Sequence, residues 1–318
     1  MEALHFDGAR LRHVDDHPHP PVGQGEALVR VRLAGICSTD LQILAGYMDF
    51  TGVPGHEFVG DVVDGSGELR GRRVVGEINY ACGRCPTCQQ GLGRHCPNRR
   101  VMGILGADGA FAEYLTVPAV NLHPVPDAVA DGEAVFTEPL AAAYSILEQV
   151  AVGPGMAVTV LGDGKLGLLC AQVLAGTGAA VTVVGKHAAN LDLVAPQGIG
   201  TRLVPGWAPD GAADCVVEAT GSAAGLELAM AAVRPRGTLV LKSTVAGSHS
   251  LSLAPLVINE VTVVGSRCGL FPPALAALAA RSVSVTPLVD AIYPLAFGVD
   301  ALSHAARPGV RKVLLATG

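Results

Sequence analysis

The sequence predicts an α/β protein that contains a doubly wound parallel sheet. The first observation is an apolar run rich in β-branched residues, Ala157–Leu161, which is typical of a buried parallel strand. The second is a glycine-rich turn followed by a helical Leu/Ala pattern. The third is another apolar run, Ala180–Val184, at the distance that a strand–helix–strand unit requires. A chain of 318 residues has room for this domain and a second one.

The glycine turn predicts a dinucleotide site. Gly162, Gly164 and Gly167 fit the pattern G-x-G-x-x-G, with Lys165 and Leu166 between the second and third glycines. The first glycine permits a tight turn, the second lets the backbone approach a pyrophosphate, and the third lets the helix pack close to its strand. The free N–H groups of the helix N-terminus then favour phosphate binding. The alternative is an ordinary glycine turn, because the chain has 40 glycines.

Composition and charge exclude several classes of protein. The net charge is −6, which gives no general attraction for nucleic acid or for an anionic membrane. The sequence has no apolar stretch that predicts a membrane span and no apolar leader at its N-terminus, so we expect a cytoplasmic protein. In such a protein eight cysteines indicate metal binding or catalysis more than disulfides.

Four of the cysteines form a compact motif. Cys82, Cys85, Cys88 and Cys96 follow the spacing C-x2-C-x2-C-x7-C. This pattern predicts a tetrahedral zinc site, which is structural because four protein ligands leave no position for a substrate. A zinc ribbon that binds nucleic acid is the alternative. The spacing argues against it, because ribbons usually bring two C-x2-C pairs from separate hairpins, and so does the acidic charge balance.

A second set of possible metal ligands precedes this motif. Cys37 follows the alternating strand pattern of Glu26–Leu33, and His56 and Glu57 come after Pro54-Gly55. A thiolate, an imidazole and a carboxylate are the ligand types of a catalytic zinc that keeps one position open. We expect Asp40 to accept the spare N–H of His56. The alternatives are a buried structural cysteine and a surface His-Glu pair.

Five segments in this order resemble the zinc-containing medium-chain dehydrogenase/reductase family. They are GICSTD, PGHEFVGDVV, the four-cysteine motif, Glu138-Pro139-Leu140-Ala141 and VLGDGKLG. The resemblance implies a GroES-like β-barrel catalytic domain over residues 1–150, with a structural zinc lobe near residues 80–98. It also implies a Rossmann domain over residues 151–282 and a return to the catalytic domain over residues 283–318. We expect strands at Val283–Leu288, Tyr293–Phe297 and Lys312–Ala316 in this last segment.

The resemblance also implies the roles of individual residues and two zinc ions per chain. Cys37 and His56 correspond to catalytic zinc ligands, and the carboxylate ligand is Glu57, Glu138 or each in turn. Thr39 matches the hydroxyl that hydrogen-bonds the substrate oxygen. Gln42 stands where many alcohol dehydrogenases carry a histidine that passes the proton to solvent. Because Gln42 does not titrate, the proton must leave by another route, such as water or the cofactor ribose.

The cofactor is predicted to be NADP in preference to NAD. An NAD site usually places Asp or Glu on the ribose hydroxyls after the second strand. Gly185 occupies that position here and is followed by Lys186 and His187, which suit a 2′-phosphate. The resemblance further implies contacts to the nicotinamide from three residues that follow later strands: Thr220, Ser243 and Ser266.

Together these features predict a zinc-dependent dehydrogenase that uses NADP or NAD. By resemblance it transfers a hydride between the nicotinamide and an alcohol or polyol, or the corresponding carbonyl compound. The family implies a homodimer or homotetramer, with Asn259–Gly265 as the pairing edge. Two alternatives stay open. One is a zinc-independent enone or quinone reductase of the same fold, and the other is a non-catalytic dinucleotide-binding protein.

Overall fold

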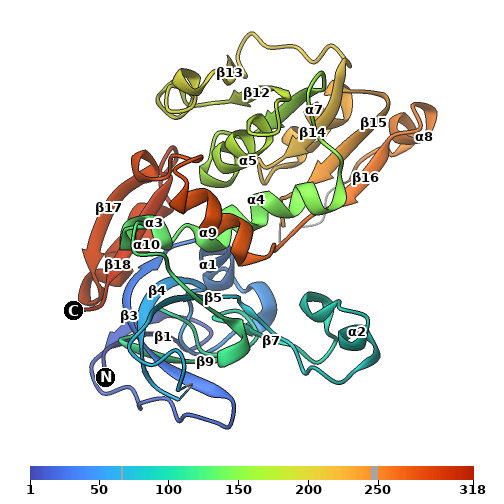
Figure 1. Cartoon of the computed structure of the whole chain (residues 1–318). Coiled ribbons are helices and arrows are strands. Elements are labelled where there is room, and N and C mark those ends of the chain that lie inside the picture. The colour runs from blue at the N-terminus through green and yellow to red at the C-terminus, as the bar shows by residue number, and fades with distance from the viewer. Residues whose placement is uncertain (66, 245–249) are drawn as a thin grey trace. The chain divides into compact units, whose positions relative to one another are not determined.

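The chain divides into two compact units in a computed structural model that describes residues 1–65, 67–244 and 250–318 (Figure 1). Unit 1 comprises Met1–Glu138, Ala274–Ala280 and Leu288–Gly318. Unit 2 comprises Pro139–Pro273 and Arg281–Pro287. The first crossing lies between Glu138 and Pro139, inside helix α4 (Thr137–Gln149), whereas the sequence analysis ended the first domain at residue 150.

Unit 1 is organised around a seven-stranded, largely antiparallel sheet. Its strands are β3 (Glu26–Gly35), β4 (Glu57–Asp64), β5 (Arg73–Gly76), β9 (Tyr114–Pro118), β10 (Leu122–Pro124), β17 (Val289–Pro294) and β18 (Lys312–Ala316). They follow the order β10-β5-β4-β3-β18-β17, and β9 also pairs with β3. The predicted alternation in β3 is confirmed, because Ala27, Val29 and Val31 are buried while Arg30 and Arg32 are exposed. The sheet therefore buries one face of its longest strand.

Smaller elements complete unit 1. They are β1 (Ala3–Phe6), β2 (Leu11–Val14), β6 (Asn79–Tyr80), β7 (Arg100–Met102), β8 (Gly106–Ala107), α1 (Ser38–Leu44), α2 (Pro86–Gln89), α3 (Asp131–Ala134) and α10 (Gly298–Ala305). Helix α2 lies on a lobe that projects from the strands of this unit (Figure 1). Helix α9 (Phe271–Ala279) begins in unit 2 and ends in unit 1.

The predicted strands near the end of the chain are partly wrong. Residues 283–288 form no strand and end in a 3-10 turn, Thr286–Leu288, while the strand lies at Val289–Pro294. Leu295–Phe297 is a second 3-10 turn. Pro287 lacks the N–H that a paired strand donates, which disfavours a strand before Leu288, and Pro294 is the last residue of β17, where the strand ends. The strand at Lys312–Ala316 is confirmed.

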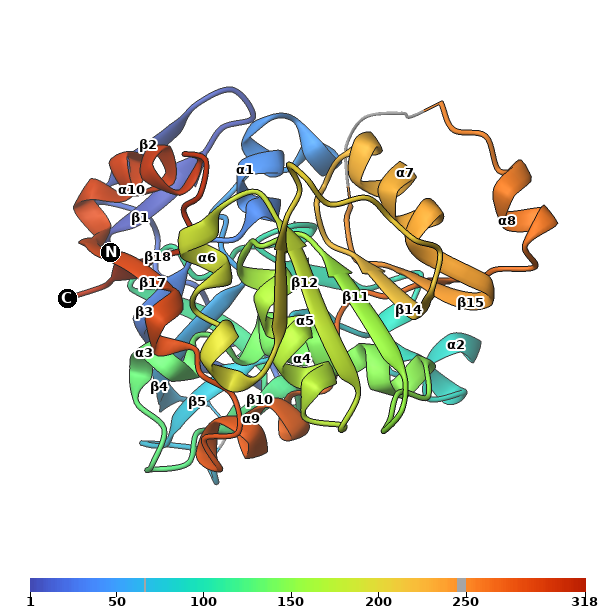
Figure 2. The ribbon, with the colours of Figure 1, turned by 90° about the horizontal axis from the view of Figure 1, so that it is seen from above.

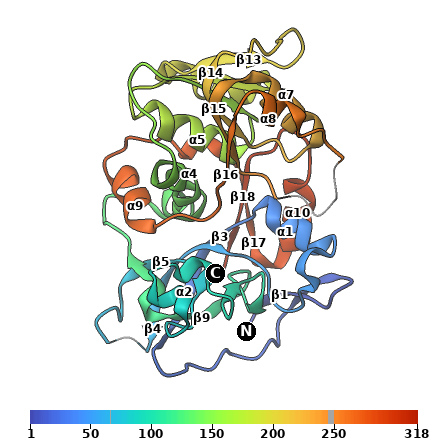
Figure 3. The same cartoon turned by 90° about the vertical axis from the view of Figure 1, so that its right-hand side faces the viewer.

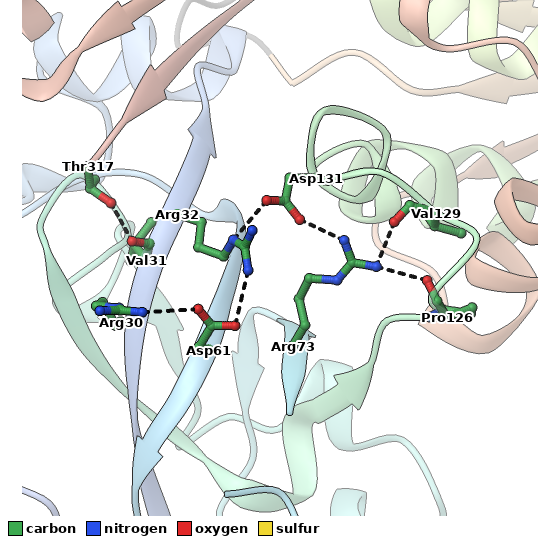
Figure 4. A network of polar contacts seen from close by, with 9 residues as sticks. All are labelled: Arg30, Val31, Arg32, Asp61, Arg73, Pro126, Val129, Asp131 and Thr317. Atoms are coloured by element: carbon green, nitrogen blue, oxygen red, sulfur yellow. Dashed lines mark hydrogen bonds and ion pairs between the residues drawn. The ribbon is translucent and has the colours of Figure 1, made fainter. Parts of the chain in front are cut away.

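A polar network ties β3, β4 and β5 to helix α3 (Figure 4). Asp61 of β4 accepts hydrogen bonds from Arg30 and Arg32 of β3 at 3.5 and 3.4 Å. Asp131, the first residue of α3, lies 2.8 Å from Arg32 Nε and 2.8 Å from Arg73 Nη1. The Arg73 guanidinium also donates to the carbonyls of Pro126 and Val129. The network therefore fixes the segment that leads into α3 against the sheet.

Unit 2 is a doubly wound parallel sheet, as the sequence predicts. Its six strands are β13 (Gly200–Leu203), β12 (Ala180–Gly185), β11 (Ala157–Leu161), β14 (Ala213–Glu218), β15 (Val233–Leu241) and β16 (Thr262–Gly265), in that order. Figure 2 shows four of them side by side, β12, β11, β14 and β15. Numbered along the chain, this order is 3-2-1-4-5-6. Ligands of such sheets bind at the carboxyl ends of the strands, beside the point where the order reverses.

Helices cover both faces of this parallel sheet. Helix α5 (Lys165–Ala175) packs against β11 and β12, and α7 (Ala223–Ala232) packs against β14 and β15 on the opposite face (Figure 3). The shorter helices of the unit are α6 (Ala188–Leu191) and α8 (Ala254–Ile258). In the part of the chain that the structure describes, no helix has the length and apolar character needed to cross a membrane.

Candidate metal and dinucleotide sites

The four cysteines of the lobe lie at the spacing of a tetrahedral zinc site. Their Sγ atoms are 3.5 Å apart for Cys85–Cys88 and for Cys82–Cys96, 3.8 Å for Cys85–Cys96, and 4.0 Å for Cys82–Cys88. Four sulfurs about 2.3 Å from a common tetrahedral centre would lie about 3.8 Å apart. All four cysteines are free thiols and not disulfides. The geometry therefore fits one closed zinc site.

The pKa values of these thiols are shifted in opposite directions. Hydrogen bonds from the backbone N–H groups of Arg84 and Cys85 lower the pKa of Cys82 to about 6. The N–H of Cys88 lowers the pKa of Cys85, whereas burial and the adjacent thiols raise the pKa of Cys88 to about 12. Four sulfurs this close cannot all carry a negative charge without a cation between them. A zinc ion would favour the thiolate form of all four.

The second cluster forms where β3 and β4 lie side by side. Cys37 follows the end of β3 and precedes α1, while His56 and Glu57 lie at the start of β4. Because Gly35 pairs with Glu57 across the two strands, the three side chains converge. One possible ligand atom from each lies within 4.8 Å of those of the other two. His56 and Glu57 are buried, and Cys37 is partly exposed.

Asp40 orients this second cluster. Its Oδ2 accepts the backbone N–H of Cys37 at 2.7 Å, and its Oδ1 lies 3.1 Å from Nδ1 of His56. This is the contact that the sequence analysis expects, and it leaves Nε2 of His56 for a metal. Burial disfavours the charged ring, but the Asp40 carboxylate and Cys37 more than offset this, so the pKa of His56 is raised well above its ordinary value.

Glu57 has one engaged oxygen and one free oxygen. Lys312, a fully buried lysine of β18, donates to Glu57 Oε2 and lies 3.5 Å from the carbonyl oxygen of Ile36. Among the described residues, Glu57 Oε1 is buried and has no hydrogen-bond partner. A buried carboxylate oxygen without a partner is costly unless a cation binds it. This oxygen, beside a thiol and an imidazole, fits a zinc ligand set.

Of the other residues predicted for the catalytic site, Thr39 lies next to this cluster, whereas Glu138 is not part of it. The hydroxyl oxygen of Thr39 is 3.8 Å from Sγ of Cys37. Gln42 follows in the same helix, α1, and is partly buried. Glu138 lies in the first turn of α4 and does not belong to the group of possible ligands that the described residues form. Sequence reasoning missed Lys312, although a single lysine in the apolar strand KVLLA was a signal.

The glycine turn of unit 2 has the shape of a phosphate cradle. Gly162 has φ +116°, and a Cβ added there would lie 2.6 Å from the carbonyl oxygen of Ala219. A Cβ on Gly167 would lie 2.0 Å from the carbonyl oxygen of Gly162. A Cβ on Gly164 would meet nothing within 4 Å, and this residue caps the N-terminus of α5. Two glycines are thus required by packing, and the middle one leaves open space beside the helix N-terminus.

The other predicted cofactor residues follow the carboxyl ends of neighbouring strands. Gly185 ends β12, Lys186 beside it is exposed, and His187 is partly exposed. Thr220, after β14, donates from both its N–H and its hydroxyl to Glu218 Oε1 at 2.6 Å. Ser243, after β15, accepts the N–H of Gly221 at 2.8 Å. Lys165 and Leu166 form the first turn of α5.

Ser266 differs from Thr220 and Ser243 because its side chain is buried. Its hydroxyl lies 2.9 Å from that of Ser145 and 3.2 Å from Nζ of Lys242. Lys242 also donates to the carbonyls of Ala142 and Arg267 at 2.6 and 2.9 Å. Ser266 therefore belongs to a buried polar cluster formed by residues of α4, by Lys242 after β15 and by the residues that follow β16. Sequence reasoning did not find this cluster, because its members are far apart in the chain.

Comparison with known proteins identifies the family. The alcohol dehydrogenase GroES-like domain matches residues 23–127, and the zinc-binding dehydrogenase domain matches residues 166–281. A sorbitol dehydrogenase of Halalkalibacterium halodurans is 29% identical over an alignment of 326 positions, which spans 95% of this chain and 94% of that protein.

Solved structures agree over the whole chain. Alcohol dehydrogenase TADH from Thermus sp. ATN1 has a TM-score of 0.91 and 31% identity and covers 100% of both chains. A structure described as a zinc-binding dehydrogenase from Sinorhizobium meliloti 1021, bound to NADP, has a TM-score of 0.88 and 27% identity and covers 99% of both chains. These matches confirm the predicted GroES-like and Rossmann domains. The protein belongs to the zinc-containing medium-chain dehydrogenase family and is an oxidoreductase of that family.

Proposed function

We propose that the protein is a zinc-dependent dehydrogenase that transfers a hydride between a nicotinamide cofactor and an alcohol or polyol, or the corresponding carbonyl compound. The observation that carries this proposal is the cluster of Cys37, His56 and Glu57, in which the buried Glu57 Oε1 has no partner among the described residues. The similarity to a sorbitol dehydrogenase supports a polyol or a related alcohol as the substrate class.

The residues of unit 1 divide the catalytic work between them. Cys37, His56 and Glu57 would hold the catalytic zinc, and Asp40 fixes the orientation of His56. Zinc bound there supplies a Lewis acid for the substrate oxygen, and the nicotinamide accepts or donates the hydride. We propose that the Thr39 hydroxyl, 3.8 Å from Sγ of Cys37, hydrogen-bonds the same substrate oxygen.

Glu57 is the carboxylate ligand that we favour over Glu138. The fully buried Lys312 balances the charge of Glu57 through Oε2, so Oε1 remains for the metal. Glu138 is the alternative ligand, either in place of Glu57 or in exchange with it. We also propose that the substrate proton leaves through water or the cofactor ribose, because the Gln42 side chain carries no titratable group.

The four-cysteine lobe would hold a second, structural zinc. Its four sulfurs fill a tetrahedral coordination shell, so no position remains for a substrate. A short helix and turns connect these cysteines, and of the four only Cys96 is fully buried. We therefore propose two zinc ions per chain, one for chemistry and one for the stability of the lobe.

The cofactor would bind along the carboxyl edge of the parallel sheet in unit 2. The open space at Gly164 supports a pyrophosphate position, and Thr220 and Ser243 are the proposed contacts toward the nicotinamide. A preference for NADP over NAD follows from Gly185, Lys186 and His187, and the NADP-bound relative is consistent with it. Ser266 is a weaker candidate for a contact, because its hydroxyl is engaged in the buried cluster.

Assembly and location complete the proposal. We propose a homodimer or homotetramer that pairs through β16, the edge strand of the parallel sheet. Exposed apolar side chains in β16 and in the preceding helix α8 support pairing, since Val263 is 43% exposed and Val257 and Ile258 are each 77% exposed. Light scattering on the purified protein would measure the assembly. A cytoplasmic location is part of the same proposal.

The test combines zinc analysis with a substrate panel. We expect elemental analysis to find two zinc ions per chain, and we expect reduction of NADP or NAD with one or more alcohols or polyols. A single zinc that is retained in Cys37→Ala would contradict the catalytic site and favour the zinc-independent reductase. Absence of hydride transfer with alcohols, polyols, aldehydes and ketones would favour a non-catalytic dinucleotide-binding protein.

A further inference from the structure

Asp163 is an acidic residue inside the glycine turn, and its side chain folds inward. It stands between Gly162 and Gly164, and its side chain is only 9% exposed. Oδ2 of its carboxylate accepts the backbone N–H of His187 at 2.5 Å and lies 3.1 Å from Nδ1 of that ring. Its backbone carbonyl accepts a hydrogen bond from Asn190 at 3.0 Å. The carboxylate is thus fixed at the turn that follows β12.

Gly185 is the residue against which this carboxylate packs. A Cβ added to Gly185 would lie 2.3 Å from Cβ of Asp163, 2.4 Å from its Cγ and 2.6 Å from its Oδ2. The carboxyl group of Asp163 therefore fills the space in which a side chain at position 185 would begin. Because these distances are too short for a real contact, any side chain at position 185 would have to displace Asp163.

This space has a defined function in dinucleotide folds. The acidic residue at the end of the second strand hydrogen-bonds the ribose 2′-hydroxyl, and its charge disfavours a 2′-phosphate. Position 185 carries no such residue in this chain. We propose that Asp163 supplies the ribose-binding carboxylate from the glycine turn, and that it opposes binding of the 2′-phosphate of NADP. This inference rests on the proposed function, since it requires that unit 2 binds a nicotinamide dinucleotide.

Two neighbouring side chains, those of Lys186 and His187, favour NADP instead of opposing it. Lys186 is exposed, and His187, whose side chain is 39% exposed, holds its Nδ1 against the carboxylate. Both suit a phosphate, as the sequence analysis argues. Asp163 therefore sets the ratio of the affinities for NAD and NADP rather than deciding alone which is bound. If Asp163 served only to orient His187 toward a 2′-phosphate, removal of its charge would weaken NADP binding instead.

Dissociation constants distinguish these two roles. NADP and NAD would each be titrated into the purified zinc-loaded protein by calorimetry, for the unmodified chain and for Asp163→Asn. We expect the ratio of the two dissociation constants to move toward NADP by about tenfold in Asp163→Asn, because a like charge near the 2′-phosphate is removed. Asp192→Asn is the matched control, since Asp192 is exposed just beyond α6, and we expect no change in its ratio.

Two further variants either remove the charge of Asp163 or move it to position 185. Asp163→Ser removes it with a smaller side chain and should move the ratio in the same direction. The double variant Asp163→Gly with Gly185→Asp places a carboxylate at the end of β12 and frees the space that it needs, so it should return the ratio to that of the unmodified chain. Thermal unfolding without dinucleotide would verify that each variant is folded.

The outcomes separate this inference from the proposed function. An unchanged ratio in folded Asp163→Asn and Asp163→Ser would overturn it, and so would a shift toward NAD, which would assign Asp163 to the orientation of His187. Both results leave the proposed dehydrogenase function intact. If the unmodified chain bound neither dinucleotide, the inference and the proposed function would both fail.

Discussion

The two cysteine-containing clusters of unit 1 differ in what surrounds their ligand atoms. The lobe cluster has four sulfurs within 4.0 Å of a neighbour and needs nothing more to enclose a tetrahedral ion. The second cluster has three possible ligands. Two of them form hydrogen bonds with side chains outside the ligand set, His56 with Asp40 and Glu57 with Lys312. The difference teaches that a closed site can be built by local spacing. An open site needs a folded sheet to hold its ligands in place.

Loss of Cys37 should separate the two clusters most clearly. In Cys37→Ala we expect kcat/KM to fall by more than about a thousandfold, because the substrate oxygen loses its Lewis acid. Elemental analysis should find one zinc in place of two. Thermal unfolding should change by only a few degrees, since the lobe keeps its own ion. Activity near that of the unmodified chain would refute the assignment of Cys37 to the metal.

Loss of Cys85 is the reciprocal variant. Cys85→Ala should also remove one zinc, but now from the lobe, and the unfolding midpoint should fall by roughly 5 °C or more because the lobe loses its cross-link. The chains that remain folded should retain their second zinc and hydride transfer. If the midpoint did not move, the four-cysteine site would have no structural role.

Removal of the lysine behind Glu57 tests the surroundings of the open cluster. In metal-free protein, Lys312→Met leaves a buried carboxylate without its cation, so unfolding free energy should drop by about 3–5 kcal/mol in a urea titration. Bound zinc should reduce this loss. Lys312→Arg, which keeps the charge, is the control. When Glu57→Gln is added to Lys312→Met, the double variant should regain part of the lost stability. If the double variant instead lost the sum of the two single losses, the two side chains would not be coupled.

Asp40→Asn tests the residue that orients His56 in the open cluster. The amide cannot anchor Cys37 and His56 with the charge that the carboxylate provides, so zinc affinity of the open cluster should fall by about 10- to 100-fold. Competition with a chromophoric chelator would measure this affinity. Asp49→Asn, at an exposed carboxylate in the next helical turn of the chain, is the control. Equal affinities for the two variants would exclude Asp40 from ligand orientation.

The smallest expected effect lies outside both clusters. Asp131→Asn weakens the contacts to Arg32 and Arg73 shown in Figure 4, and because these groups are partly exposed the cost should be about 1 kcal/mol. Zinc content and activity should stay unchanged. Loss of either zinc in this variant would show that the clusters depend on the whole sheet and not only on their immediate neighbours.

Local patterns explain what the sequence predicted well. The glycine motif and β11 are defined by adjacent residues, and the predicted span Ala157–Leu161 is the observed strand. The four-cysteine spacing is equally local. Lys312 was not predictable in this way, because it reaches Glu57 only through the pairing of β18 with β3, which are remote in sequence. Asp163 stood inside the recognised motif, but the direction of its side chain depends on Gly185 and on the turn after β12.

The position of β18 has a consequence for synthesis. This strand lies between β3 and β17, yet its residues follow all of unit 2 along the chain. A nascent polypeptide emerging from the ribosome therefore displays Cys37, His56 and Glu57 long before Lys312 appears. The four-cysteine lobe, whose ligands span residues 82–96, has no such delay. The four cysteines of the lobe are therefore all synthesised early, whereas the surroundings of Cys37, His56 and Glu57 are complete only after the last strand has been made.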